Sequence, residues 1–259
     1  MNFEKIDLND LKKAKMLLEN PGIAAKMTNL LGTPIEKGFR LLPANWNDKI
    51  GNVTQTALSQ AVNAAIFTMK DHPFKQSSNI WHKIIVATTG GIGGFFGISA
   101  LAVELPISTT IMLRSIADIA RSEGEIIKDI ESKIACLEVF ALGGPSENDD
   151  ASNSGYFAVR TALARSLTES AEYIGKNGLI IEGSPVFVRL IIKIAERFSI
   201  QVSEKAAAQA IPVIGLAFGS IINTLFINHF QSMARGHFIV RRLERRYTKE
   251  VVEATYKIV

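Results

Sequence analysis

The chain has 259 residues, of which 47% are hydrophobic and 21% are charged, with 19 glycines, 8 prolines and a single cysteine. This composition excludes a disordered chain, a collagen-like repeat and a disulfide-stapled miniprotein, and one cysteine allows neither an internal disulfide nor a multi-cysteine metal site. The net charge of +4 combines +4 in residues 1–83, −4 in residues 84–234 and +4 in residues 235–259, so two basic ends flank an acidic middle.

The N-terminal residues MNFEKIDLND alternate charged and apolar side chains without a hydrophobic run, so no signal peptide is expected there. Together with the single cysteine, this favours a reducing, cytoplasmic compartment. We expect residues 1–75 to form an N-terminal helical segment and residues 76–259 to form the main helical domain, joined in one continuous unit. Within the first segment, residues 48–70 show the spacing of an amphipathic helix.

Two long apolar blocks raise the question of a membrane span. Residues 84–103 contain no charged side chain and end at Glu104 and Pro106, and residues 206–234 contain no formal charge. Either block is long enough to cross the hydrocarbon core of a bilayer. However, glycines weaken a helix in the first block, polar side chains dilute both blocks, and charges lie close by. These features favour a helix buried within the fold, while a stable span, and a buried helix that can enter a bilayer, stay open.

Glycines of the two blocks stand four residues apart, which places both members of a pair on one helix face. Small residues at this spacing let two helix backbones approach closely, in membranes and in tightly packed bundles alike. We therefore predict a buried, glycine-rich apolar hairpin in which the two blocks cross. The residues expected at this close contact are Gly90, Gly94, Gly97, Gly215 and Gly219.

A charged stripe continues the first apolar block. Polar and charged side chains recur at intervals of three or four residues from Thr110 to Glu125, so they lie along one helix face. Pairing of Arg114 with Asp118 and of Arg121 with Glu125 at the i, i+4 spacing is typical of a solvated face laced with salt bridges. Because the neighbouring faces are apolar, a groove that recognises an anionic head group is the alternative. The residues expected to recognise a ligand or head group are Glu104, Thr110, Arg114, Asp118 and Arg121.

Most of the remaining sequence has the periodicity of helices that face a core, over residues 128–141, 159–174 and 186–198. Alternating β patterns with hairpin signals are missing from the sequence. The turn-forming stretch from Gly143 to Gly155 is the clearest internal break. The sequence therefore predicts an all-α fold, a helical bundle around the apolar hairpin.

The segment RGHFIVRRLERRY, residues 235–247, combines basic side chains with an apolar face. Such a basic amphipathic helix is typical of proteins that bind an anionic membrane surface. Arginines four residues apart repel one another on an isolated helix, so intramolecular acidic partners, Glu244 among them, are the alternative. Nucleic acid is not an expected partner, because recognition motifs and a strongly basic domain are missing. The residues expected to contact the anionic surface are Arg235, His237, Arg241, Arg242, Arg245 and Arg246.

No motif of a known reaction is present, so no catalytic residue is predicted. GGIGGFFG lacks the GK[ST] ending of a phosphate loop, and neither GxSxG nor HExxH occurs. His229 and His237 lie eight residues apart and could share a metal ion with an acidic side chain, but histidines so placed are usually core or interface residues. The acidic side chains that could join them are Glu104, Asp118 and Glu138. We predict no metal site and no cofactor.

Long motifs in the second part of the chain resemble the EcsC family of bacterial proteins. The first motif is GGFFGISALAVELPISTTIMLRSIADIARSEGE, followed by CLEVFALGGPSENDD and SGYFAVRTALA. The second signature of the family is similar to SEKAAAQAIPVIGLAFGSIINTLFINHFQSMARGHFIVRRLERRY. The resemblance covers about residues 80–250, and residues 1–75 are less distinctive.

The resemblance implies a role linked to secretion or transport and brings no established reaction, cofactor or catalytic residue. On residues and resemblance together, we expect a cytoplasmic accessory protein, peripheral to the inner membrane, that binds a lipid, another hydrophobic ligand or a membrane partner such as a transporter. A binding protein is favoured over an enzyme. Were it an enzyme acting on a lipid-like substrate, its pocket would be expected to hold Glu104, Arg114, Asp118 and Arg121. A structural homo-oligomer, with the glycine faces buried between subunits, is the other alternative.

Overall fold

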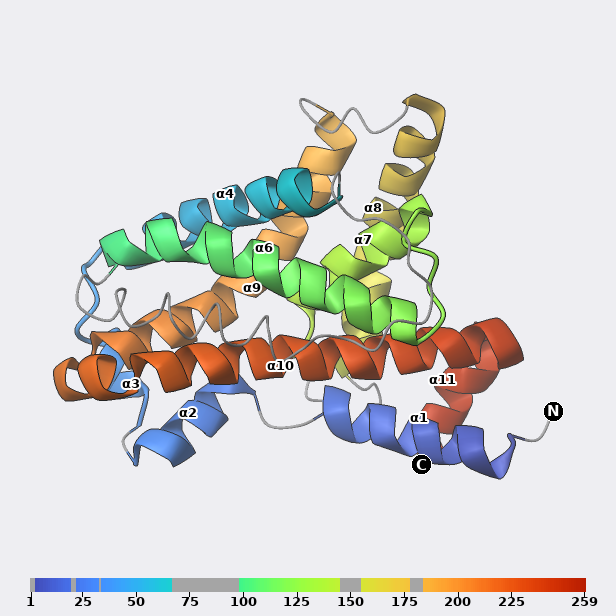
Figure 1. The fold of residues 1–259 in the computed structure, drawn as a ribbon, viewed down its shortest axis with the longest axis horizontal. Helices are drawn as coiled ribbons and strands as arrows, with labels where there is room; N and C mark the ends of the chain where they lie inside the picture. Colours follow the sequence, from blue (N-terminus) through green and yellow to red (C-terminus); the bar gives the residue numbers. More distant parts are fainter. Residues whose placement is uncertain (1–2, 20–21, 33, 67–97, 145–154, 178–183) are drawn as a thin grey trace.

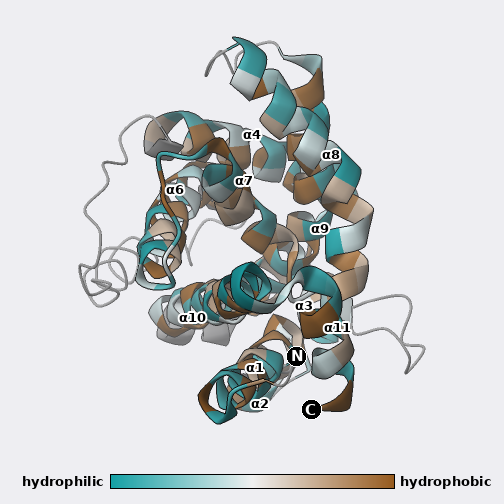
Figure 2. Ribbon diagram, turned by 90° about the vertical axis from the view of Figure 1, so that its right-hand side faces the viewer, coloured by the Kyte–Doolittle hydropathy of each residue, from teal (hydrophilic) through white to brown (hydrophobic). Residues whose placement is uncertain are grey.

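The computed structural model describes residues 3–19, 22–32, 34–66, 98–144, 155–177 and 184–259. Throughout these ranges the chain forms helices and the turns between them, without a strand, which confirms the predicted all-α fold (Figure 1). Figure 2 shows hydrophilic and hydrophobic residues mixed along the helices, as expected where each helix buries one face against its neighbours.

Proline marks the start of two of the long helices. Proline occupies the first position of α9 and of α10, where its missing N–H would have no partner within the helix. The helices are α1 (Lys5–Leu18), α2 (Ile23–Leu31), α3 (Glu36–Phe39), α4 (Trp46–Ile66), α6 (Ile98–Ser122), α7 (Ile130–Glu138), the 3-10 helix η1 (Val139–Ala141), α8 (Gly155–Asn177), α9 (Pro185–Ala210), α10 (Pro212–Tyr247) and α11 (Lys249–Ile258).

Helix α10 runs through the centre of the fold. Its 36 residues span about 54 Å at 1.5 Å per residue. Helices α1 and α2 pack on one side of it and α6 and α9 on the other, and α11 folds back at its C-terminal end (Figure 1). Thr248, with a φ of 83°, breaks the helical path between α10 and α11. The N-terminal segment predicted for residues 1–75 supplies α1 to α4, each of which packs on a later helix.

An aromatic cluster joins the middle of α10 to α9 and to the end of α7. Phe226 and Phe230 of α10 pack against Phe198 of α9 and Phe140 of η1, with ring centroids 4.9 to 6.0 Å apart. All four side chains are buried. Aromatic pairs at such distances stabilise a core beyond the burial of their apolar surface. The cluster therefore fixes the C-terminal end of α7 to the centre of the molecule.

Two glycines mark places where helices approach backbone to backbone, and neither belongs to the predicted hairpin. A Cβ atom at Gly38 of α3 would lie 1.9 Å from the carbonyl oxygen of Ala207 on α9. A Cβ atom at Gly236 of α10 would lie 2.6 Å from Cγ of Leu18 and 3.1 Å from the carbonyl oxygen of Ala14, both on α1. A larger residue at either position would push the two helices apart.

The predicted glycine-rich hairpin lies largely outside the described residues. Three of its five contact glycines, Gly90, Gly94 and Gly97, fall outside them. Gly215 and Gly219 belong to α10, and Gly219 is buried there. The crossing of the two apolar blocks therefore stays a prediction. Among the helices that the structure describes, none combines the length and the apolar character needed to cross a membrane.

Candidate functional site

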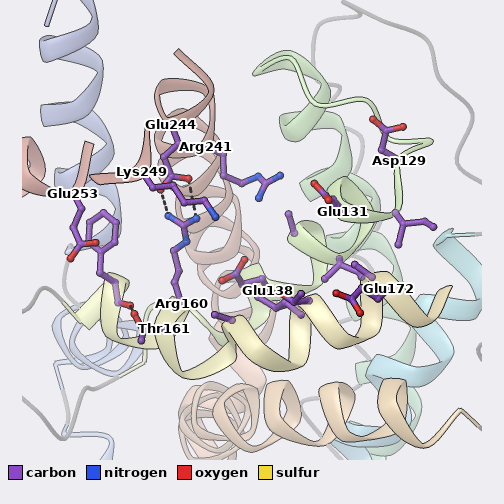
Figure 3. Close-up of a pocket in the computed structure, with 18 of the residues that line it drawn as sticks. Asp129, Glu131, Glu138, Arg160, Thr161, Glu172, Arg241, Glu244, Lys249 and Glu253 are labelled. Atoms are coloured by element: carbon purple, nitrogen blue, oxygen red, sulfur yellow. Dashed lines mark hydrogen bonds and ion pairs between the residues drawn. The ribbon is translucent and has the colours of Figure 1, made fainter. Parts of the chain in front are cut away.

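A cleft of about 1030 Å³ opens between α7, α8, α10 and α11 (Figure 3). Buried apolar side chains form its base, with Ile134 and Ala135 from α7 and Phe157 from α8. Half-buried Leu167 and Ala171 continue this apolar surface along α8. Charged side chains from all four helices or their ends surround it. The cleft therefore joins an apolar wall to a polar rim, the combination usual in ligand sites.

Glu138, the last residue of α7, places a carboxyl group at the base of the cleft. Its side chain is 4% exposed, and its Oε1 atom has no hydrogen-bond partner among the described residues. The Oε2 atom lies 3.6 Å from Nε2 of His237, which is too long for a hydrogen bond. Burial raises the pKa of this carboxyl, and the charges of Arg160 and Arg241 oppose that effect only in part. The fold thus leaves hydrogen-bonding capacity of Glu138 unused.

Next to Glu138, His237 of α10 and Tyr156 of α8 form a buried polar pair. The Tyr156 hydroxyl lies 3.0 Å from Nδ1 of His237. Burial lowers the pKa of His237 well below its ordinary value and raises the pKa of Tyr156, so both groups are uncharged near neutral pH. The three side chains form a short polar chain from the cleft into the core. In the part of the chain that the structure describes, no three side chains of the metal-binding types gather around one point.

Two arginine–glutamate pairs form the side walls. Arg160 of α8 donates to both carboxylate oxygens of Glu244 on α10, at 2.6 and 3.0 Å. Arg241 of α10 donates to both oxygens of Glu125, at 2.9 and 3.3 Å. Such two-point pairs hold the guanidinium plane in one orientation. The walls of the cleft are therefore built from charges that are already oriented before any ligand arrives.

Glu125 is the centre of a buried charge cluster behind the cleft. Besides Arg241, it accepts hydrogen bonds from Arg245 and, at 2.7 Å, from the Ser132 hydroxyl. Burial alone would raise the pKa of Glu125, but the hydrogen bonds and charges of these partners outweigh burial and hold the pKa below its ordinary value. Glu125 therefore stays ionised at neutral pH, and the cluster of one carboxylate and two guanidinium groups keeps a net positive charge.

At the rim of the cleft, several charged side chains form no ion pair within the described part of the chain. Asp129 and Glu131 at the start of α7 and Glu172 on α8 form no ion pair within the described ranges. Lys249 at the start of α11 likewise forms none there. In the view of Figure 3, the three acidic side chains lie on one side of the opening and Lys249 lies on the other. The rim thus presents both signs of charge to whatever enters.

The five predicted recognition residues do not form one site, and none of them lines this cleft. Glu104 is buried in the core between α6 and α9, where Lys205 donates to its carboxylate. The Lys205 ammonium also lies 4.9 Å from the centre of the Phe226 ring. The sequence analysis did not predict a role for Lys205, which the structure shows to be fully buried. Glu104 thus acts with Lys205 in the core and apart from the rest of the predicted stripe.

The other four residues of the stripe stay on α6. Asp118 and Arg121 form an ion pair with each other, and the Thr110 hydroxyl donates to the carbonyl oxygen of Pro106 at 2.8 Å. Arg114 is exposed. Arg121 thus pairs with Asp118, and its predicted partner Glu125 binds Arg241 and Arg245 instead. Recognition of a head group by this face stays a prediction.

The arginines near the end of α10 bind acidic side chains of other segments. Arg242 donates to Glu123 at 2.9 Å and to Asp10 of α1 at 2.7 Å. Arg246 pairs with Asp7 of α1 at 2.7 Å. Intramolecular partners, the alternative left open by the sequence, are therefore present. These pairs tie α1 and the turn after α6 to the C-terminal part of α10.

Two details of the basic segment differ from expectation. Glu244, expected to serve the arginines of its own helix, binds Arg160 of α8. His237 is fully buried against Tyr156 and Glu138, so it does not face a surface in this structure. Arg235 is exposed. Contact of the arginines with an anionic surface stays a prediction. Their ion pairs with acidic side chains neutralise part of the positive charge that such a contact would use.

The sequence interpretation named Glu138, Arg241 and Glu244 separately but did not bring them together, because four separate segments supply the residues of the cleft. Periodicity shows which face of a helix is buried but does not show which helices meet. One signal was available for Glu138, a single charge within the apolar run IACLEVFAL. Lys205 gives a weaker signal, because it follows Glu204 directly and precedes the apolar run AAAQAIPVIG. Charged residues almost never become fully buried unless they are paired or functional.

Fold and site together define an all-α protein with an amphiphilic cleft between its helices. The model of the EcsC protein family matches residues 5–243, so the chain belongs to the EcsC family. The match includes most of the N-terminal segment as well as the part that carries the recognisable motifs. No curated protein sequence and no solved structure matches the chain at a significant level.

Proposed function

We propose that this EcsC protein binds a lipid or another amphiphilic ligand in the cleft between α7, α8, α10 and α11, as an accessory protein at a membrane. The observation that carries the proposal is the union of an apolar wall and buried charged groups in one cavity of about 1030 Å³. The hydrocarbon part of the ligand would cover Ile134, Leu167 and Ala171, and its head group would meet Glu138 and the rim. Transfer of the hydrocarbon from water supplies the affinity, and the polar groups supply orientation.

An exposed apolar face of α6 supports contact with a membrane. Val103 is 70% exposed and Ile107, one turn later, is 46% exposed. Arg114 follows two turns further along the same face, and the uncharged residues 84–103 lead directly into it. An apolar surface beside an arginine suits the boundary between lipid tails and anionic head groups. We place the protein in the cytoplasm, peripheral to the inner membrane, next to a partner linked to transport or secretion.

The cleft is tested by filling it. Ala171→Trp introduces an indole where the ligand chain would lie, and Ala162→Trp adds the same side chain to an exposed position of α8 outside the cleft. We expect the first variant to lower the affinity for a fluorescent lysophospholipid at least tenfold and the second to leave it unchanged. Equal binding by both variants would contradict the proposal. Mass spectrometry of lipids extracted from the purified protein gives an independent readout.

The membrane face is tested separately by flotation with liposomes that contain phosphatidylglycerol. The double variant Val103→Glu and Ile107→Glu should remain in the unbound fraction, because two carboxylates replace the apolar contact and are repelled by the anionic lipid. Val188→Glu, at a position of α9 that is 40% exposed, is the control and should float like the wild type. If the double variant floats with the liposomes, Val103 and Ile107 do not form the membrane contact, and another face of the protein must do so.

An enzyme that acts on the bound ligand is the second candidate. It is favoured by one observation, the burial of Glu138 beside the uncharged imidazole of His237 at the base of a cavity. This location differs from the pocket expected on α6. Incubation with a lysophospholipid followed by mass spectrometry separates the two functions. Products that form with the wild type and not with Glu138→Gln would favour the enzyme, and recovery of unaltered lipid would favour the binding protein.

A further inference from the structure

The polar groups of the cleft indicate which class of amphiphile it takes. We infer that the cleft selects a zwitterionic head group, with its cationic nitrogen at Glu138 and its phosphate or carboxylate at Arg241 and Lys249. The inference rests on the proposed function, because it requires an amphiphile in the cleft. It adds the chemistry that distinguishes one head group from another.

Glu138 supplies the contact for the cationic nitrogen. Its side chain is more than nine-tenths buried, it lines the cleft, and its Oε1 atom has no partner among the described residues. The arginines on the walls do not donate to it, because Arg160 is bound to Glu244 and Arg241 to Glu125 in two-point pairs. A buried carboxyl oxygen without a hydrogen-bond donor costs free energy that an incoming donor recovers. A protonated amine fits this position best, because its N–H groups can donate to Oε1 and its positive charge favours the carboxylate form that burial disfavours.

The acidic side of the rim favours a cation over a neutral donor. Asp129, Glu131 and Glu172 form no ion pair within the described part of the chain, and Figure 3 shows them on one side of the opening. Like charges gathered around a cleft create a potential that attracts the opposite charge. An anionic head group alone would be repelled from this side. The cationic nitrogen is therefore directed towards the side of the cleft that α7 and the C-terminal half of α8 form.

The other side of the opening supplies the contact for the anion. Lys249 forms no ion pair in the described ranges and has three rotatable donors. Arg241 uses Nε and Nη2 for Glu125, which leaves the donors of Nη1 without a described partner. Glu253 lies near Lys249 in Figure 3, but Lys257 holds it at 3.0 Å. A phosphate or carboxylate would therefore find two cationic donors here.

One head group can reach both sides because they border the same opening. In Figure 3, Lys249 lies on the opposite side of the opening from Glu131 and Glu172, and Arg241 and Glu138 lie between the two sides. A head group whose nitrogen and anion are a few bonds apart would pair with both. A purely cationic amphiphile would leave Lys249 without a partner, and a purely anionic one would leave Glu138 without one. The arrangement thus favours the zwitterion over either single charge.

Four probes with the same decyl chain test this selectivity by isothermal titration calorimetry below their micelle-forming concentrations. They are decylphosphoethanolamine, decyl phosphate, decylammonium and decyl maltoside. We expect decylphosphoethanolamine to bind at least tenfold more tightly than the other three, since a hydrogen bond or ion contact to a buried charge is worth about tenfold or more in affinity. Equal affinity for all four probes would overturn the selectivity while leaving the amphiphile site in place. Failure of every probe to bind would overturn both the selectivity and the proposed function.

Variants assign the selectivity to individual side chains. Glu138→Gln keeps the shape of the side chain and removes its charge, so the preference for decylphosphoethanolamine over decyl phosphate should fall about tenfold. Glu172→Gln, at an exposed rim position that cannot unfold the protein, should lower the same preference about two- to threefold. Glu169→Gln, on α8 outside the cleft, is the control and should leave the preference unchanged. An undiminished preference in both cleft variants would overturn the assignment.

Discussion

Two buried glutamates show how differently this fold treats a carboxyl group. Glu104 on α6 is 5% exposed and is bound by Lys205, a fully buried cation that also lies over the Phe226 ring. Glu138 on α7 is buried to the same degree, yet its Oε1 atom has no partner among the described residues. Equal burial with unequal pairing fits a structural role for the first carboxyl and the binding role that we propose for the second, since the described residues leave Oε1 of the second open to a ligand or water.

The locations of the two carboxyls explain the difference. Glu104 faces the interior between α6 and α9, where the buried cation Lys205 pairs with it. Glu138 ends α7 beside a cavity, next to arginines that other carboxylates already hold. A buried ion pair is a weak source of stability by itself, but the loss of one partner is costly. The comparison therefore predicts opposite responses when the two sites are changed.

The largest effect is expected from Lys205→Met. This change keeps the length of the side chain but leaves Glu104 charged, buried and without its cation, so the free energy of unfolding should fall by about 3–5 kcal/mol. Urea denaturation followed by circular dichroism measures the change. Lys193→Met, which removes a bond to the Ser166 hydroxyl at 2.8 Å, is the control and should cost about 1 kcal/mol. A loss below about 1 kcal/mol for Lys205→Met would contradict the structural role of the pair.

A third carboxyl, Glu204 on α9, is partly buried and should make the free energy of unfolding depend on pH. Burial raises its pKa to about 7, and a hydrogen bond with the backbone of Ala24 opposes the rise only in part. Because the folded pKa exceeds the unfolded value of about 4.3, the folded state binds more protons between these two pH values. The stability that protonated Glu204 provides is therefore lost as the pH rises from about 4.3 to about 7.

The variant Glu204→Gln should remove this pH dependence. At pH 8 it should raise the free energy of unfolding by about 3–4 kcal/mol, because each unit of pKa shift corresponds to about 1.4 kcal/mol, and it should have little effect at pH 4. Denaturation curves at both pH values measure the difference. Glu196→Gln, at an exposed position of the same helix, is the matched control and should show no such pattern. Equal stability of wild type and Glu204→Gln at pH 8 would show that the carboxyl is solvated.

A smaller effect of the opposite sign to that of Lys205→Met is expected from Glu138→Gln. No described residue donates a hydrogen bond to Oε1, and Nε2 of His237 lies 3.6 Å from Oε2. Removing the charge of Glu138 therefore breaks no close ion pair among the described residues. The free energy of unfolding at pH 8 should stay constant or rise by about 1 kcal/mol, since an uncharged amide is easier to bury than a carboxylate. Thermal denaturation measures it. A loss of more than about 2 kcal/mol would place Glu138 with Glu104 as a structural group.

The helical fold could be predicted because the spacing of apolar residues within a short stretch of sequence is enough to indicate a helix. The packing of the basic end of α10 was only half predictable. Repulsion between arginines four residues apart indicated acidic partners, but Glu123 and Asp10, which bind Arg242, come from distant segments. The close contacts at Gly38 and Gly236 were not predicted either, because the residues that they approach lie on other helices. The sequence around a glycine does not show which helix packs against it.

The cleft shows the same limit more clearly. Its walls come from α7, α8, α10 and α11, so no window of sequence contains it. The stripe on α6 attracted the functional prediction because its charges follow a visible spacing, whereas Glu138 and Arg160 occur singly. Lone charges in apolar surroundings would have been the better guide, since the free-energy cost of burial is what distinguishes them. Glu104 and Glu138 satisfy that criterion, whereas Lys205 directly follows Glu204.

The smallest effect on stability is expected at Arg114, the exposed member of the stripe. Its interactions lie at the surface, where an ion pair contributes less than about 1 kcal/mol, so Arg114→Ala should change the free energy of unfolding by no more than that. Its place on the same face as Val103 and Ile107 predicts a different loss. A basic residue near an anionic surface is worth about 1 kcal/mol, so the partition coefficient onto phosphatidylglycerol liposomes should fall about fivefold at low salt. At high salt the wild type and the variant should converge, because screening removes the contribution of the charge but leaves that of the apolar face. A stable variant with unchanged partitioning at low salt would separate the stripe from the membrane, whereas a strongly destabilised one would move Arg114 into the same structural class as Lys205.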